Sequence, residues 1–311
     1  MKADLKLQKT APYFERIRNI PKLSISRHII IAVLLFTAAI FVGQILEMIL
    51  MAVIAFGIIG AKNAEDIDIQ LILQLYLTVV VTAFTFLFCR LCDNRPVKTM
   101  FLTSRKMIPD YLTGALLGMA MMTAVALAAW GCGALQFDGF QSKQKPLIMI
   151  LLFIGWILQG FSEEIACRGW LMSSIGTHHS AWSAVTVSAL MFALLHISNN
   201  GFSLLAVVNL FLFGVAASLF VLRTGSIWGA AAMHSVWNWA QGNFFGLQVS
   251  GLETGSTIFK FSQTGNAAWI GGEKFGLEAG VGTTAVTLIV IVILLLLPQR
   301  KSQEEQENGT V

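Results

Sequence analysis

The sequence predicts an all-α polytopic membrane protein, a bundle of about eight transmembrane helices with the N- and C-termini in the cytoplasm. Of its 311 residues, 56% are hydrophobic and only 12% are charged, which is about half the charged fraction of a soluble domain. Apolar segments of about 20 residues, the length that crosses a bilayer, recur along the chain. Lys and Arg gather on one side of these segments, which sets the orientation.

The apolar segments define the predicted spans. They are 28–59, 71–89, 111–135, 147–171, 181–198, 203–222, 226–245 and 281–298. The first is too long for the short apolar region of a signal peptide, so we expect it to be a retained helix. Residues 246–280 are rich in Gly, Ser, Thr and Asn, and we expect an irregular or short-stranded extracytoplasmic loop there.

The basic residues are distributed unevenly between the two sides of the predicted bundle. Eight spans place fifteen Lys and Arg residues on the side of the termini and five on the other side. This asymmetry predicts a basic cytoplasmic tail at 1–27 and a polar cytoplasmic tail at 299–311. Because the basic residues fall at helix ends, the net charge of +4 indicates membrane lipids as surroundings and no nucleic-acid partner.

Ionisable residues inside the predicted spans are functional candidates, because charge at membrane depth costs free energy unless it is paired or solvated. They include Glu47, Glu163, Glu164, Arg168, His196 and His234. Every Asp falls in a predicted tail or loop, which argues against a two-aspartate intramembrane protease. The chain has neither His-Glu-x-x-His nor Gly-x-Ser-x-Gly, so the zinc-protease signature and the serine nucleophile elbow are missing.

Two adjacent carboxylates and an arginine lie in one apolar stretch. Glu164 and Arg168 are four residues apart on one helix face, with the acid on the N-terminal side, which favours an ion pair. Glu163 points about 100° away from Glu164. We therefore expect Arg168 to neutralise Glu164 and Glu163 to remain free as a base. A structural salt-bridge cluster of all three residues is the alternative.

Two further polar sites lie on other predicted helices. His234 and Asn238 are one turn apart on one face, and both can donate hydrogen bonds to a developing oxyanion. Hydrogen bonding between helices is the alternative for this pair. His196 ends the fifth span, where a lone histidine also fits a cap. The residues Gln44, Gln74, Gln159, Asn209 and Gln241 fit helix–helix contacts better than chemistry.

The order of these motifs is more specific than any one of them. Glu-Glu-x-x-x-Arg at 163–168, Phe-x-x-x-His at 192–196 and His-x-x-x-Asn at 234–238 resemble the CPBP family of CAAX-protease and bacteriocin-processing intramembrane endopeptidases, also called the Abi family. The resemblance covers roughly 147–245. It implies a catalytic transmembrane core at 147–245. The N-terminal transmembrane helices at 28–146 and the last transmembrane helix at 281–298 are predicted from their apolar segments, and the resemblance does not specify them.

The resemblance also implies an activity and its residues. Glu163 and His196 would activate a water that hydrolyses a peptide bond, while His234 and Asn238 would stabilise the oxyanion. Glu164 and Arg168 would support Glu163. The substrate would be a peptide or a membrane protein, no cofactor is required, and we expect a bacterial plasma membrane as the location.

Two other interpretations stay open. Glu163, His196 and His234 would supply three ligands of a zinc site with an open position, which makes a zinc-dependent version of the same protease. Alternatively, the polar residues only join helices in a non-enzymatic scaffold or immunity protein.

The predicted depths of these residues disagree. With a rise of about 1.5 Å per residue, Glu163 and His234 each lie about 12 Å from the cytoplasmic ends of their spans. His196 lies about 22 Å in by the same reckoning. If the fifth helix does not begin later or tilt, Glu163 and His196 cannot hold the same water.

Overall fold

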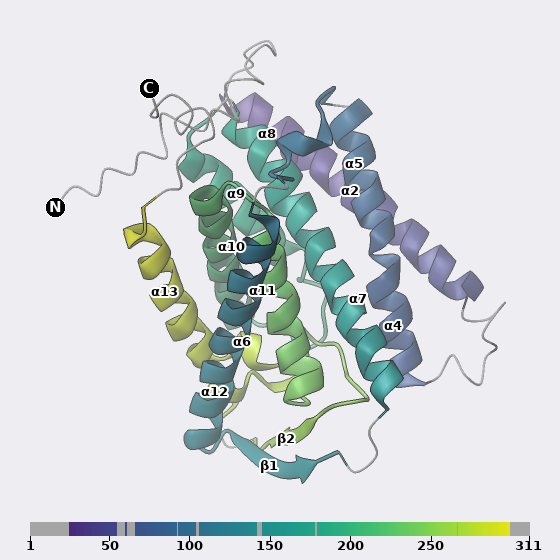
Figure 1. Cartoon of the computed structure of the whole chain (residues 1–311), viewed down its shortest axis with the longest axis vertical. Helices are drawn as coiled ribbons and strands as arrows, with labels where there is room; N and C mark the ends of the chain where they lie inside the picture. Colours follow the sequence, from purple (N-terminus) through teal and green to yellow (C-terminus); the bar gives the residue numbers. More distant parts are fainter. Residues whose placement is uncertain are drawn as a thin grey trace.

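The computed structural model is a helix bundle whose long helices run along the molecule, with a two-stranded sheet at one end (Figure 1). The structure describes residues 25–54, 60, 66–91, 93–103, 106–141, 145–177, 179–265 and 267–298. The predicted tail at 299–311, most of the tail at 1–27 and the end of the first predicted span at 55–59 lie outside the described residues.

The helices and strands follow one another without an obvious repeat. In chain order they are α2 Ile25–Ala52, α4 Ile67–Leu77, α5 Val79–Leu91, the short η3 Val97–Thr99, α6 Met107–Gly131, β1 Leu135–Phe140, α7 Pro146–Glu164, the π-helical η4 Ile165–Met172, α8 Ser173–Gly176, α9 Ala181–Leu194, α10 Leu204–Thr224, α11 Trp228–Trp239, the π-helical η5 Ala240–Phe244, β2 Phe259–Gln263, α12 Ala268–Gly271, η6 Glu273–Phe275, η7 Leu277–Ala279 and α13 Val281–Leu296.

Helices lie at all eight predicted positions, but they are not equally long. Five segments are long and apolar enough to cross a membrane by length and composition: Ile29–Ala52, Ile67–Leu91, Met107–Gly131, Pro146–Gly176 and Leu204–Thr224. The apolar helices α9 and α13 are shorter, and α11 has 12 residues. The helical membrane class is thus supported, whereas the count of eight spans and the side of the termini stay predictions.

The predicted end of the fourth span at Leu171 is wrong, because the helix continues as η4 and α8 to Gly176. The polar residues that suggested an end are satisfied inside the protein. Ser173 donates to the carbonyl of Trp170 and accepts a hydrogen bond from Arg95 at 2.7 Å. Arg95 is only 5% exposed, so this end of the helix is held by a buried guanidinium rather than by solvent.

The expectation that every Asp lies in a tail or loop is also wrong. Asp68 and Asp110 lie in the first turns of α4 and α6 and are buried. These two helices begin at opposite ends of the bundle (Figure 1), so the two residues do not form a dyad. Asp68 accepts hydrogen bonds from the backbone N–H and the hydroxyl of Ser256, at 2.7 and 2.6 Å, and so anchors the 246–280 segment to α4.

The centre of the bundle is α11, which packs against α6, α7 and α10. Its residues from Gly229 to Asn238 are all buried. On α6, Gly114 and Gly118 lie one turn apart, and a Cβ at either position would overlap the backbone carbonyl of Gly229 or Met233. Small residues at this spacing let two helix backbones approach closely, and this contact fixes the height of α11.

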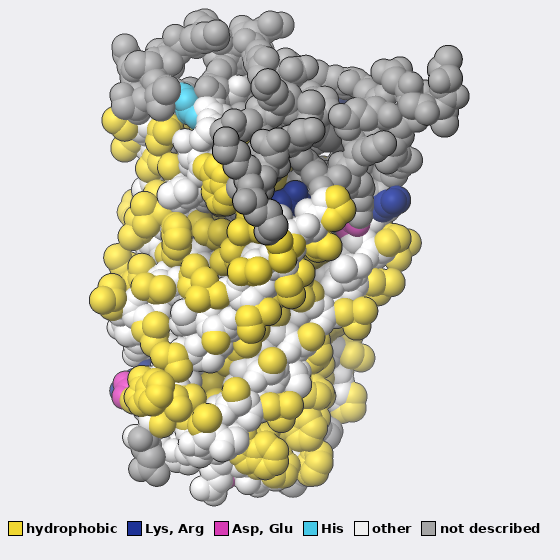
Figure 2. All heavy atoms as spheres, turned by 90° about the vertical axis from the view of Figure 1, so that its left-hand side faces the viewer, with side chains coloured by type: hydrophobic (Ala, Val, Ile, Leu, Met, Phe, Trp, Pro, Cys, Tyr) yellow, Lys and Arg dark blue, Asp and Glu magenta, His cyan; other side chains and the backbone are white. Residues whose placement is uncertain are grey.

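The surface of the bundle suits a lipid environment. On the face drawn in Figure 2, hydrophobic side chains cover the middle, and Lys and Arg side chains appear nearer one end. On α13, the side chains of Ile289, Val292 and Ile293 are 59%, 53% and 50% exposed. Such a band is expected where side chains meet hydrocarbon rather than water.

The segment 246–280 is irregular with one short strand, as the sequence predicts. Its strand β2 pairs antiparallel with β1, from Leu135 opposite Gln263 to Phe140 opposite Phe259. The register shifts between Phe137 and Gly139. The sheet lies at the end of the bundle away from α8 (Figure 1), so this segment closes that end beneath α11.

The close approach of α6 and α11 gives a testable prediction. Gly118→Ala should destabilise the protein in detergent by about 1–3 kcal/mol, because a methyl group there forces the two backbones apart. The same substitution at Gly131, where a Cβ meets nothing within 4 Å, is the control and should leave the melting temperature unchanged. Equal melting temperatures for the two variants would contradict the packing described above.

Candidate functional site

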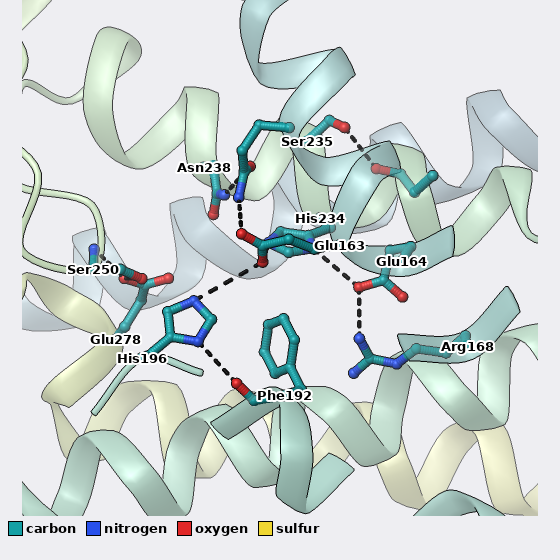
Figure 3. A network of polar contacts seen from close by, with 12 residues as sticks. Glu163, Glu164, Arg168, Phe192, His196, His234, Ser235, Asn238, Ser250 and Glu278 are labelled. Atoms are coloured by element: carbon teal, nitrogen blue, oxygen red, sulfur yellow. Dashed lines mark hydrogen bonds and ion pairs between the residues drawn. The ribbon is translucent and has the colours of Figure 1, made fainter. Parts of the chain in front are cut away.

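The residues predicted from three separate motifs converge in the middle of the bundle (Figure 3). Glu163 lies in the last turn of α7, His196 in the turn after α9, and His234 on α11. The Oε2 atom of Glu163 is 3.9 Å from Nε2 of His196 and 3.8 Å from Nε2 of His234. Oε2 is buried and accepts no hydrogen bond from the described residues. One carboxylate oxygen therefore faces two imidazole nitrogens.

The disagreement in depth between Glu163 and His196 disappears once the observed end of the Glu163 helix is used, although His234 lies only about 9 Å from Trp228, where α11 begins. From Gly176, the end of the run that contains Glu163, Glu163 lies about 20 Å in by the usual helical rise. This agrees with the depth of about 22 Å for His196 counted from Ala181. The mismatch arose because the predicted span ended at Leu171, five residues too early.

Glu164 is the partner of both Arg168 and His234. Nη1 of Arg168 lies 2.9 Å from Oε1 of Glu164, and both side chains are fully buried. Nδ1 of His234 lies 3.0 Å from the same oxygen. The expected pairing of Glu164 with Arg168 is thus present. Because a carboxylate only accepts, Nδ1 of His234 carries the proton, and Nε2 is turned toward Glu163.

His196 is oriented by its own helix. Its Nδ1 lies 2.9 Å from the carbonyl oxygen of Phe192, one turn earlier, so Nδ1 is the donor and Nε2 faces Glu163. The ring also packs on Phe192, with ring centroids 5.0 Å apart. The guanidinium carbon of Arg168 lies over the same Phe192 ring, 4.6 Å from the ring centroid. Phe192 therefore separates His196 from the Glu164–Arg168 pair.

The structure adds Gln159, a residue that the sequence interpretation had assigned to helix contacts. Nε2 of Gln159 donates to Oε1 of Glu163 at 2.6 Å. Its Oε1 accepts from Nδ2 of Asn238 at 3.0 Å. Asn238 is thus linked to Glu163 through the carboxamide of Gln159. The Oδ1 atom of Asn238 is buried without a partner among the described residues. In the sequence, the contact between Gln159 and Glu163 is indicated only by their spacing of four residues, which makes two side chains neighbours on a helix.

A second unexpected residue is Glu278, which enters from the 246–280 segment. Its Oε2 accepts from the backbone N–H and the hydroxyl of Ser250, at 2.6 and 2.7 Å. With His196, His234 and Asn238 it lines a cavity of about 10 Å³, room for about one water. No sequence pattern marks this residue, because a Glu in a polar loop is ordinarily solvated.

Asn209 holds the backbone next to Glu278 in place. Its Nδ2 donates to the carbonyls of Glu278 and Gly280, both at 2.8 Å. The expectation that Asn209 joins elements rather than doing chemistry fits these contacts. The contacts attach the 246–280 segment to α10, directly below the site.

The three donors of the zinc alternative do not form a metal site as they are placed. Glu163 Oε2 and the two imidazole nitrogens are 3.8 and 3.9 Å apart, whereas ligand atoms on tetrahedral zinc are separated by roughly 3.3 Å. Among the residues that the structure describes, no group of three or more His, Cys, Asp or Glu side chains is arranged to hold a metal ion. A zinc version would need these side chains to move together.

Comparison with known protein families agrees with this geometry. Residues 145–240 match the family model described as Type II CAAX prenyl endopeptidase Rce1-like. The match covers 96 of the 311 residues, so over this segment the chain is similar to that protease family. The match begins with α7 and ends with α11, so it contains Glu163, His196, His234 and Asn238. No curated protein matches the chain.

The family match gives the chain a coarse identity. It is an enzyme with a peptide or protein as substrate, and its apolar helices make it an integral membrane protein. Gln159 lies within the matched segment, whereas Ser250 and Glu278 lie beyond its end. Ser250 and Glu278, which line one side of the cavity, therefore belong to a part of the chain that the match does not cover.

Burial raises the pKa of the Glu278 carboxyl above its ordinary value of 4.5, although the hydrogen bonds from Ser250 oppose this shift. A raised pKa in the folded state means that stability is lost as the pH rises through it. Glu278→Gln keeps an acceptor for Ser250 and removes the titration. The melting temperature of this variant in detergent should therefore decline less from pH 4.5 to neutral pH than that of the wild type.

Glu253→Gln is the matched control, because Glu253 is exposed in the same segment. It should leave the pH dependence of the melting temperature as it is in the wild type. If Glu278→Gln and the wild type decline in parallel, folding does not raise the pKa of Glu278.

Proposed function

We propose that this chain is an intramembrane endopeptidase of the glutamic type, in which Glu163 is the base. The observation that carries the proposal is the position of Glu163 Oε2, unpaired and 3.8–3.9 Å from Nε2 of both His234 and His196. At this separation the atoms make no direct hydrogen bond, and in the proposed site one water binds to all three. A carboxylate that binds such a water can take its proton as the oxygen attacks a carbonyl carbon.

The reaction requires no covalent intermediate. The water oxygen forms a bond to the peptide carbonyl carbon, and one water proton passes to Glu163. The carbonyl oxygen becomes an oxyanion, which Asn238 stabilises through the Nδ2 hydrogen that Gln159 does not use. His234 joins it as an imidazolium, which donates Nδ1–H to Glu164 and Nε2–H to the oxyanion. When the C–N bond breaks, the leaving amine takes the proton from Glu163.

The remaining residues support this chemistry electrostatically. Glu164 is neutralised by Arg168 at 2.9 Å, so the site does not hold two uncompensated adjacent carboxylates. His196 donates through Nδ1 to Phe192 and accepts a hydrogen bond from the water at Nε2. In the proposed arrangement this nitrogen orients the water between His196 and Glu163.

The proposal includes the arrangement of the chain in the membrane. Eight helices cross the bilayer, with both termini cytoplasmic, 147–245 as the catalytic core and 246–280 outside. The asymmetry of fifteen against five basic residues supports this topology. The cavity would then open toward the cytoplasm, in a bacterial plasma membrane. Reporter fusions after residue 298 and within 246–280 should report opposite sides.

Replacing the base gives the decisive test. Glu163→Gln should lower kcat on a fluorogenic peptide by about 10²–10⁴-fold, because the amide cannot take the water proton. The peptide is offered with and without a prenylated carboxy-terminal cysteine, in protein reconstituted into lipid vesicles. Glu253→Gln is the control and should cleave at the wild-type rate. Near-normal turnover by a folded Glu163→Gln variant would refute the mechanism.

Two other functions give different results in the same preparation. A zinc-dependent protease would contain about one zinc per chain by elemental analysis and would lose activity to a chelator. A scaffold or immunity protein would cleave no peptide, and substitutions at Glu163, His196, His234 and Asn238 would leave its binding function intact. The family match to proteases favours the enzyme.

A further inference from the structure

Gln159 connects the two halves of the proposed machinery. It lies on α7, one turn before Glu163, and its side chain reaches Asn238 on α11. Glu163 is the proposed base and Asn238 the proposed oxyanion donor, and these two residues face one another in Figure 3. In the described part of the chain, this carboxamide is the direct polar link between them.

The chemistry of a carboxamide fixes the direction of both hydrogen bonds. Glu163 as a carboxylate only accepts, so the NH₂ group of Gln159 must point toward it, as it does at 2.6 Å. The oxygen of Gln159 then points to Asn238, which must present its own NH₂ group, as it does at 3.0 Å. A flip of either amide would bring two oxygens or two NH₂ groups together.

Two consequences for the site follow from this fixed direction. First, Oε1 of Glu163 is occupied by Gln159, so Oε2 is the oxygen left facing the two imidazoles. Second, the NH₂ group of Asn238 is held toward Gln159, and the hydrogen that this contact does not use is the one left for an oxyanion. Asn238 is only 4% exposed, so water does not compete to reorient it.

We infer that Gln159 is a positioning residue of the reaction, which selects the oxygen of Glu163 that accepts the water proton and the end of Asn238 that meets the oxyanion. This inference rests on the function proposed above. It departs from a purely structural role, in which Gln159 would join α7 to α11 and nothing more. A structural role predicts lost stability, whereas a positioning role predicts lost turnover in a folded protein.

The experiment compares Gln159→Met with the wild type in vesicles. Met has a similar length and makes neither hydrogen bond, so kcat should fall about 10- to 100-fold, the usual loss when a residue that orients a reacting group is removed. KM should stay within about twofold, since the substrate-contacting surface is unchanged. Gln74→Met on α4, a half-buried Gln on a helix that packs against α7, should keep the wild-type kcat.

Two further variants separate the roles. Gln159→Glu keeps an acceptor for Asn238 but puts a second carboxylate against Glu163, so it should be at least as slow as Gln159→Met. In an Asn238→Ala background, Gln159→Met should cost less than in the wild type, because residues that act through one another are not additive. Melting temperatures in detergent identify which variants fold, and Gln159→Asn, too short to reach both partners, replaces Met if Met does not fold.

The outcomes distinguish this inference from the proposed function. If Gln159→Met folds and keeps its kcat while Glu163→Gln is inactive, Gln159 is not a positioning residue, and the mechanism stands. If Glu163→Gln keeps its activity, the proposed function fails, and the role of Gln159 in it fails as well. Full additivity of Gln159→Met and Asn238→Ala would also overturn the inference.

Discussion

The buried carboxylate of Glu164 is the constraint on which the site depends. One of its oxygens holds Arg168 at 2.9 Å and His234 at 3.0 Å, so a single atom ties α7 and the π-helical turn after it to α11. A charge at this depth would be costly if any partner were missing, since breaking a buried pair costs about 3–5 kcal/mol. The same contact turns Nε2 of His234 toward Glu163. Folding and the orientation of the site are thus enforced together.

Most of the site was predictable because its residues are ionisable and lie in apolar segments. Glu163, Glu164 and Arg168 stand out on hydropathy and spacing alone, as do His234 and Asn238, and the resemblance gave His196 its proposed role. The pairing of Glu164 with Arg168 followed from helix periodicity and is present. The depth of Glu163 was mispredicted because hydropathy ends a helix at its first polar residues. Here Ser173 is buried and bonded to Arg95, so the helix continues.

The contributions of Gln159 and Glu278 were not predictable in the same way. A glutamine in a membrane helix is ambiguous, and only the position of Asn238 on another helix shows what its carboxamide joins. Glu278 comes from a loop that looks solvated, and its burial depends on Ser250 and on the docking of the backbone by Asn209. Both assignments need long-range contacts, which composition and periodicity do not contain.

The complete burial of α11 has a consequence for how its sequence is constrained. Its residues from Gly229 to Asn238 face other parts of the protein on every side, so this helix is not selected for solubility in lipid. What limits its side chains is volume, because α6 and Gly160 on α7 approach it at backbone distance. Small residues therefore fill the first turns of α11, from Gly229 to Ala232, and His234 and Asn238 follow further along the helix. Hydropathy marks such a helix as a span, whereas only its packing shows that its side chains do not meet lipid.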